Sequence, residues 1–329
     1  MSIKTLEKED IPKGEERDIS EIITIMRDFL KKKYPPGETV RHFHPKMHGC
    51  LKAQFVVKDT IPDDKKVGLF KEAKTYDAWI RFSNAPPTKK SDKRATSRGM
   101  AIKVLGVEGE VIEKDEIEEK TQNFLMTTSP VLSVGNVKNY KKAIYALTKG
   151  PLRMLLYGIN PFNWRVIAIT LLRAKKHTNL LNVEYFTGSP FLFGNKGVVK
   201  FCARPQKLSS DKNHKKGSSH FLRERLVEDL RSRDAVFDFL VQFQNNPKTE
   251  PIENTSIEWK STFYKVAEIH IPIQVFNYQS RIIFGENLFF SPWQCLKDHK
   301  PLGGINRARK AVYQSLSEYR KKRNGVNKE

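Results

Sequence analysis

Cysteine is scarce in this sequence, which has only Cys50, Cys202 and Cys295 among 329 residues. The count is odd and no Cys-x-x-Cys pair occurs. That usage argues against a disulfide framework and against a cysteine-based zinc site. It fits a reducing compartment, and we expect a cytoplasmic protein.

Long apolar runs are also missing. The longest clearly apolar run, residues 166–172, is far shorter than the roughly 20 residues that span a bilayer. The N-terminus is charged, so we expect no secretory signal. No internal repeat and no glycine loop of the dinucleotide-binding type is present.

Negative charge is in short supply, since 59 Lys and Arg face 37 Asp and Glu and give a net charge of +22. Much of the excess lies in residues 207–216 and 320–328. Such a charge can simply solvate the surface, or it can attract nucleic acid, anionic lipid or an anionic ligand. No helix-turn-helix, zinc-finger or RNA-binding signature appears, so we expect no specific nucleic-acid partner.

Residues 306–320 form the most informative stretch, because they lack Gly and Pro and should be helical. Arg309, Tyr313, Leu316 and Arg320 are spaced i, i+4, i+7 and i+11, which places them on one helical face. A guanidinium one turn away favours the phenolate form of a tyrosine, and a phenolate is an axial ligand for haem iron. An ordinary basic surface helix explains the same spacing.

The rest of the chain alternates strand-like and helix-like segments, after a polar N-terminal arm over residues 1–18. We expect a helix at 21–33, with Ser20 as its cap, and others at 140–147 and 221–231. Residues 151–176 are apolar with interleaved basic residues. They predict a pair of packed helices, or a membrane-surface contact. Strands are expected at 51–58, 75–84, 98–105, 123–126, 185–193, 197–203, 237–243 and 264–271.

Three histidines fall within residues 41–49, at positions 42, 44 and 48. No Cys, Asp or Glu completes a metal set nearby, so a metal site is weakly supported. One of the histidines could serve as an acid or base over a reacting oxygen. A polar loop is the alternative.

Several motifs occur in an order that resembles the haem domain of catalases. They are Arg41-x-x-His44-x-Lys46-x-x-Gly49, Ile80-Arg81-Phe82-Ser83, Arg98-Gly99-Met100-Ala101-Ile102-Lys103, Pro130-Val131-Leu132 and, near the C-terminus, Arg309-x-x-x-Tyr313. The segments 289–293 and 299–309 are similar to short, catalase-related haem proteins. The resemblance covers residues 38–323.

This resemblance implies an α+β fold with an antiparallel β-barrel core, surrounding helices and a C-terminal helix that carries the proximal ligand. It also implies three parts: an arm and helix over residues 1–37, a haem domain over 38–323 and a basic tail over 324–329. The cofactor would be haem b.

The resemblance also assigns roles to single residues. His44 matches the distal acid–base histidine and Ser83 the serine that orients it, while His42 and His48 are expected to be structural. Tyr313 matches the proximal iron ligand, and Arg309 the arginine that keeps it ionised. The places of the arginines that bind the haem propionates are occupied by Arg41, Arg81 and Arg320.

One departure from the family pattern concerns the distal asparagine of catalases. At that place this chain has Thr127 and Thr128, followed by Ser129-Pro130. A threonine hydroxyl is shorter than the amide, so we predict weak dismutation of hydrogen peroxide. Asn123, four residues upstream of Thr127, is a less favoured substitute.

Three functions remain open from the sequence. The first is a haem-dependent peroxidase that acts on hydrogen peroxide or organic hydroperoxides, with an unidentified electron donor. The second is an enzyme that rearranges fatty-acid hydroperoxides, as allene oxide synthases do, with residues 151–176 admitting an anionic lipid. The third is a non-catalytic basic protein that binds nucleic acid or membranes. We expect a monomer or a homodimer.

Overall fold

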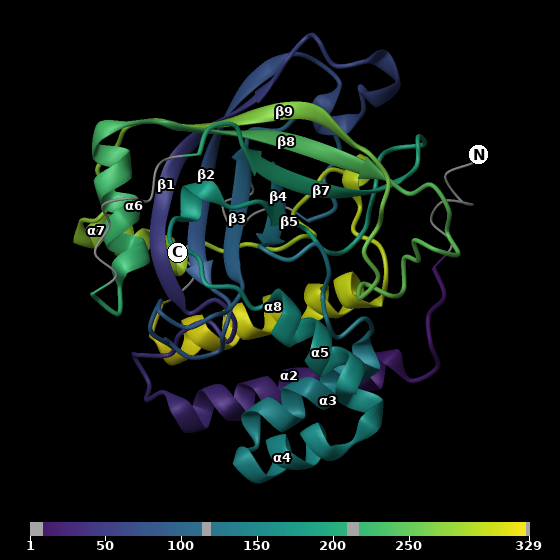
Figure 1. Ribbon diagram of the computed structural model, residues 1–329, viewed down its shortest axis with the longest axis vertical. Coiled ribbons are helices and arrows are strands. Elements are labelled where there is room, and N and C mark those ends of the chain that lie inside the picture. The colour runs from purple at the N-terminus through teal and green to yellow at the C-terminus, as the bar shows by residue number, and fades with distance from the viewer. Residues whose placement is uncertain (1–8, 114–119, 209–216, 327–329) are drawn as a thin grey trace.

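An antiparallel β-barrel forms the centre of the molecule (Figure 1). The structure is a computed structural model, and it describes residues 9–113, 120–208 and 217–326. In the described ranges, the strands join in the order β5-β4-β3-β2-β1-β9-β8-β7-β6, and a β5–β7 pairing closes the ring. The strands are β1 (Lys46–Val57), β2 (Lys74–Asn84), β3 (Arg98–Leu105), β4 (Thr121–Thr127), β5 (Tyr185–Phe186), β6 (Phe191–Leu192), β7 (Val198–Pro205), β8 (Ala235–Phe243) and β9 (Phe263–Ile271).

Phenylalanine rings fill the interior of the barrel. The ring of Phe239 lies with its centroid 5.0 Å from that of Phe55 and 4.7 Å from that of Phe124. Phe201 packs against Phe124 at 5.0 Å. Such close aromatic packing leaves a filled core, so a ligand as large as a porphyrin would have to bind outside the barrel wall.

The helices surround this barrel. They are α2 (Glu15–Lys33), α3 (Val137–Thr148), α4 (Pro151–Ile159), α5 (Trp164–Arg173), α6 (Phe221–Ser232), α7 (Gln279–Asn287) and α8 (Gly304–Arg323). Figure 1 shows α8, in yellow, running beneath the barrel, with α2 and α3 on its far side. Ala308 and Val312 of α8 pack there against Ile22, Met26 and Val137. The opposite face of α8 is therefore left to face the barrel.

A largely buried ion cluster holds the start of α8 in place. Arg307 binds the carboxylates of Glu9, Glu15 and Glu253, and its Nε lies 2.6 Å from Glu15 Oε1. The backbone N–H of Gly304 donates to Glu253 at 2.8 Å. Carboxylates at a helix N-terminus accept hydrogen bonds from its free N–H groups and interact favourably with the positive end of the helix dipole.

The structure corrects several boundaries expected from the sequence. The first helix starts at Glu15 rather than at residue 21, so Ser20 lies inside it, and three acidic residues in its first turn replace the expected cap. The strand expected over 51–58 begins at Lys46. The strand expected over 185–193 is two short strands, because Gly188 turns the chain between them with φ +67°.

The sequence-based expectations also missed one helix, and some of them concern residues that the structure does not describe. Helix α7, which borders the candidate site, was not predicted. Residues 151–176 do form two helices, as expected. Four ranges lie outside the described residues: 1–8 of the N-terminal arm, 114–119, 209–216 of the basic stretch 207–216, and 327–329 of the tail. The division into arm, haem domain and tail stays a prediction.

Candidate functional site

His44 lies in the turn just before β1, beside the barrel wall. Its backbone has φ 58°, a left-handed conformation that a residue other than glycine seldom adopts. Arg81 Nη1 donates to the His44 carbonyl at 3.1 Å, and Ser83 Oγ lies 2.9 Å from His44 Nδ1. Arg81 and Ser83 are two residues apart on β2, so one face of that strand holds both the backbone and the ring of His44.

Gly99 makes room for the His44 ring. It lies on β3, opposite Ser83 in the ladder. A Cβ atom built at this position would lie 2.4 Å from His44 Nδ1 and 2.9 Å from Ser83 Oγ. The glycine therefore allows the His44 ring to lie close to the backbone of β3.

Burial, together with the positive charges of Arg81, Arg309 and Arg41, lowers the pKa of His44 from its usual 6.5 to about 3. The imidazole is therefore neutral at pH 7. One ring nitrogen is held by Ser83, which leaves the other available for chemistry.

Arg41 and Arg81 converge on the C-terminal end of α7. Arg41 Nη2 donates to the carbonyls of Glu286, at 3.0 Å, and Leu288, and Arg81 Nη2 lies 3.3 Å from the Glu286 carboxylate. Burial holds the pKa of the Arg41 guanidinium well below its usual value, and the charges of Arg320 and Arg81 lower it further. Among the described residues, the buried Arg41 Nε finds no hydrogen-bond acceptor.

Arg41, Arg81 and Arg320 form a cluster of guanidinium groups whose charges act on one another. The charges of Arg320 and Arg81 lower the pKa of Arg41, while Glu286 raises it and pairs with Arg81. Arg320 is buried, at 5% exposure, and together with Glu286 it lines a cavity of about 630 Å³. Guanidinium groups of this kind are suited to binding carboxylates.

On the α8 side, the guanidinium of Arg309 lies 5.4 Å from the centre of the Tyr313 ring. The Tyr313 side chain is partly buried, and its hydroxyl forms no hydrogen bond within the part of the chain that the structure describes. Tyr140 of α3 borders the same place. Burial raises its pKa, the nearby Tyr313 raises it further, and Arg309 opposes this effect.

Asn306 and Ser189 hold Arg309 in place. Arg309 Nη1 donates to Ser189 Oγ and to Asn306 Oδ1, each at 3.3 Å. Asn306 is itself fixed, since its amide donates to the carbonyl of Pro190 at 2.9 Å. Sequence reasoning missed both residues, as it missed Gly99, Glu286 and Tyr140. Their place in the site depends on contacts between distant segments.

Thr127 and Thr128, which the resemblance puts at the place of the distal asparagine, both form hydrogen bonds with backbone groups. Thr128 Oγ1 accepts from the Arg98 N–H at 3.2 Å. Thr127 Oγ1 donates to the Ser129 carbonyl at 3.3 Å. Thr127 pairs with Gly99 in the β3–β4 ladder, which brings it to the strand that carries the His44 contact. Asn123 lies elsewhere, with its amide donating to Gln294 Oε1 at 2.6 Å.

The other two histidines of the 41–49 segment have structural surroundings. The His42 ring packs edge-on between Phe29 and Phe43, with centroid distances of 5.2 and 4.7 Å. His48 Nε2 lies 2.7 Å from Asn84 Oδ1 within a buried polar network. In the described ranges, no group of three His, Cys, Asp or Glu side chains could hold a metal ion by itself.

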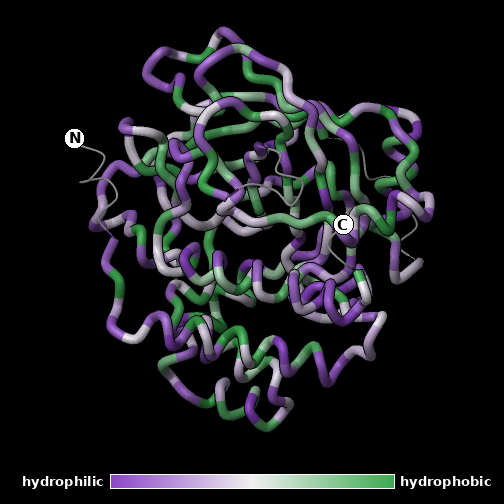
Figure 2. The backbone as a smooth tube through the Cα atoms, turned by 180° about the vertical axis from the view of Figure 1, so that it is seen from behind, coloured by the Kyte–Doolittle hydropathy of each residue, from purple (hydrophilic) through white to green (hydrophobic). Residues whose placement is uncertain are grey.

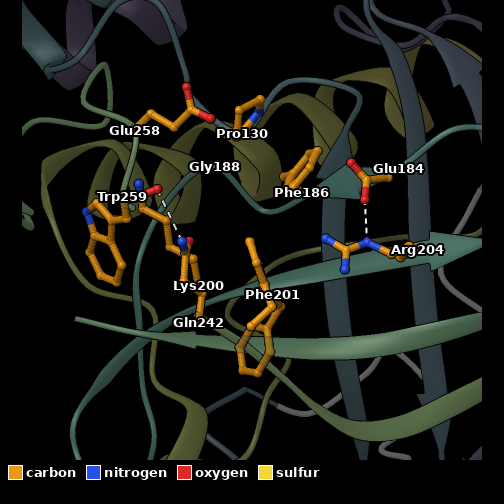
Figure 3. A pocket seen from close by; sticks show the side chains of 11 residues that line it. Pro130, Glu184, Phe186, Gly188, Lys200, Phe201, Arg204, Gln242, Glu258 and Trp259 are labelled. Carbon is orange, nitrogen blue, oxygen red and sulfur yellow. Dashed lines mark hydrogen bonds and ion pairs between the residues drawn. The ribbon is translucent and has the colours of Figure 1, made fainter. Parts of the chain in front are cut away.

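A second cavity, of about 180 Å³, lies beside β7 and contains none of the residues predicted for the site (Figure 3). The Glu184–Arg204 ion pair lines one side of it. On another side lies Lys200, whose pKa burial lowers to about 8 and whose Nζ lies 4.6 Å from the centre of the Trp259 ring.

The sequence of this chain matches no protein-family model and no curated protein. Its structure is similar to those of solved catalases. A fungal catalase aligns with a TM-score of 0.68 and 15% identity, covering 92% of this chain and 64% of the catalase. Catalase A from Saccharomyces cerevisiae aligns with a TM-score of 0.68 and 16% identity (89% and 63%), and a bacterial catalase with 0.64 and 15% (91% and 61%).

These comparisons establish a catalase-like fold and confirm the predicted α+β barrel with surrounding helices and a C-terminal helix. The chain spans less than two thirds of the length of the catalases that it matches.

Proposed function

We propose that this protein is a haem-dependent enzyme that reduces hydrogen peroxide or organic hydroperoxides with electrons from a separate donor. The observation that carries the proposal is the position of Arg309. Its guanidinium lies over the Tyr313 ring, and its charge also reaches the His44 imidazole on the barrel side. These two observations support the proposal that the predicted proximal and distal residues face one shared space.

The residues around this space fit a haem. Tyr313 would bind the iron through its hydroxyl oxygen, and the Arg309 charge favours the phenolate form. Arg41, Arg81 and Arg320 would bind the two propionates. The buried Arg41 Nε without an acceptor and the repulsion among the three guanidinium groups both support an anionic occupant.

When bound, haem would supply the redox chemistry that cleaves the O–O bond. His44 would accept a proton from the inner peroxide oxygen and return it to the leaving oxygen. This role requires the tautomer in which Nδ1–H donates to Ser83 Oγ, so that Nε2 is the free base. Because burial disfavours the imidazolium, the accepted proton is readily passed on.

We further propose that dismutation of hydrogen peroxide is weak. The hydroxyl of Thr128 is bonded to the Arg98 N–H, and that of Thr127 to the Ser129 carbonyl. Neither replaces the side-chain amide that polarises a second peroxide molecule in catalases.

Rearrangement of fatty-acid hydroperoxides is the second candidate. The observation that favours it is the exposed, apolar and basic pair of helices α4 and α5, which suits an amphiphilic substrate. Loss of the conjugated diene from a lipid hydroperoxide without added reductant would identify this reaction. A protein that stays colourless after haem supplementation would support the non-catalytic alternative.

The proposal predicts a sharp effect of His44→Gln. The variant should lose about 10²–10⁴-fold in hydroperoxide turnover, because general acid–base catalysis contributes that much, and should still take up haem. The measurement is donor oxidation by the haem-loaded protein, with oxygen evolution followed in parallel. His42→Phe is the matched control and should retain its activity. Unchanged turnover in His44→Gln, or vigorous oxygen evolution by the wild type, would contradict the proposal.

A further inference from the structure

A large apolar surface lies at the end of the molecule away from the barrel. Among the described residues, 11 of the 20 exposed large apolar side chains fall within residues 145–172, so the exposure is concentrated in one segment. Phe162 is 87% exposed and Leu172 is 75% exposed. We call this surface the α4–α5 face. Its members are Tyr145, Leu147, Leu152, Met154, Leu155, Leu156, Ile159, Phe162, Trp164, Leu171 and Leu172.

Helix α4 is the centre of this face. It has the sequence Pro-Leu-Arg-Met-Leu-Leu-Tyr-Gly-Ile, and none of its residues is buried. Figure 1 shows α4 at the lower edge of the molecule, beyond α3, and Figure 2 shows hydrophobic (green) backbone at the same edge from behind. Monomeric proteins rarely expose large apolar patches unless something binds there.

The chain segment that carries this face has charged side chains of one sign only. Residues 121–183 contain nine Lys and Arg and no Asp or Glu, a net charge of +9. Three of these cations pair with carboxylates from other segments: Lys141 with Asp18 and Glu21, Lys149 with Asp28, and Arg173 with Glu258. The other six are exposed and form no ion pair with described residues: Lys138, Lys142, Arg153, Arg165, Lys175 and Lys176.

We propose that the α4–α5 face docks on an anionic lipid bilayer. Leucine, isoleucine, phenylalanine and tryptophan side chains would enter the boundary between headgroups and acyl chains, and the surrounding cations would bind lipid phosphate and carboxylate groups. Helices α4 and α5 have 9 and 10 residues, lengths that suit helices lying in the membrane plane. In the described ranges, no helix is long and apolar enough to cross a membrane.

The same charges disfavour a second copy of this chain as the occupant. A twofold dimer through this face would place the same patch on both sides of the interface. The six exposed cations of each copy would then oppose those of the other, with no acidic residue of segment 121–183 to balance them. An anionic bilayer satisfies the apolar surface and the charge together, and its binding does not depend on the proposed haem chemistry.

The test is co-sedimentation of the full chain with vesicles of phosphatidylcholine alone or mixed with phosphatidylserine. The wild type should bind the phosphatidylserine vesicles and release as salt rises, because surface electrostatics are screened. The double variant Leu155→Asp/Phe162→Asp should lower the vesicle-bound fraction at least about tenfold. Its control, Ile273→Asp/Val275→Asp, places the same charges on exposed apolar residues elsewhere and should bind as the wild type does.

A second pair of double variants distinguishes the effect of charge near the α4–α5 face from the effect of the protein's net charge. Arg165→Glu/Lys176→Glu should weaken binding, whereas Lys52→Glu/Lys71→Glu changes the net charge equally on other surfaces and should not. Absence of binding to phosphatidylserine vesicles, or equal losses in target and control variants, would overturn the proposal. So would a lipid-free dimer in sedimentation velocity that Leu155→Asp/Phe162→Asp dissociates, because a second copy would then cover the face.

Discussion

His44 combines two properties that are individually unfavourable. Its backbone is left-handed at φ 58°, and its ring is buried among arginines that disfavour protonation. Such features persist only where surrounding contacts enforce them, and they cluster at functional sites. Here Arg81 holds the carbonyl and Ser83 holds the ring, so β2 enforces both.

The sequence predicted part of this arrangement. The resemblance predicted that Ser83 orients His44, and Ser83 Oγ lies 2.9 Å from His44 Nδ1. Arg81, two residues before Ser83 on the predicted strand, also contacts His44. Gly99 was recognisable only as a strand glycine, because its role depends on the β2–β3 register that brings it opposite Ser83. The left-handed turn at His44 had no sequence signal, since most histidines have negative φ.

His42 supports a prediction about acid stability. Burial lowers the pKa of its imidazole to about 4, below its ordinary 6.5. Between these pH values the unfolded chain binds a proton that the folded chain excludes, so stability falls as the pH drops from 6.5 towards 4. His42→Phe retains the aromatic packing and removes this titration. The variant should lose less stability over that range, by roughly 3 kcal/mol for a full 2.5-unit shift.

Denaturant unfolding of both proteins at pH 7 and pH 4 measures this difference. Other groups that titrate are the same in the two proteins, so their contributions cancel. Parallel losses of stability in the wild type and in His42→Phe would show that His42 takes up its proton without unfolding.

Helix α8 shows how one element serves packing and the site. Ala308 and Val312 pack on α2 and α3, while Arg309 and Tyr313 turn to the other side. The helical spacing predicted the Arg309–Tyr313 pair. Leu316, which shares the predicted stripe, packs instead at the edge of the cluster with α2 and α3. The four residues of this stripe contact more than one neighbouring element, and the sequence alone does not show which residue contacts which element.

The position of α8 should depend on the Arg307 cluster. Arg307→Met would leave three carboxylates, of Glu9, Glu15 and Glu253, without their shared cation. Breaking a buried ion network in this way should lower the free energy of unfolding by roughly 3 kcal/mol. Arg17→Met is the matched control, because the Arg17 side chain is 78% exposed and 3.9 Å from Glu21, and it should cost less than about 1 kcal/mol. Equal effects in thermal or denaturant unfolding would contradict this account.

At the scale of the whole molecule, most strands and helices could be predicted from their periodicity, within a few residues at each end. Closure of the barrel could not be predicted from the sequence. It depends on β5, a strand of only two residues that pairs with β4 and β7. Helix α7 was missed for a related reason, since only its Gly285 is buried and its sequence has little amphipathic pattern. From the sequence, residues 151–176 could form a pair of packed helices or a membrane-surface contact. Only the exposure of each side chain in the structure bears on that choice.

The whole molecule presents a filled barrel with a helix beneath it, and we propose that a dianionic macrocycle binds between the two. The most direct test is the visible absorption spectrum of the haem-supplemented protein and of its Tyr313→Phe variant. The account predicts a Soret band typical of tyrosinate-bound haem in the wild type, and a changed or absent band in Tyr313→Phe. A colourless wild-type protein, or identical spectra for the two, would contradict it.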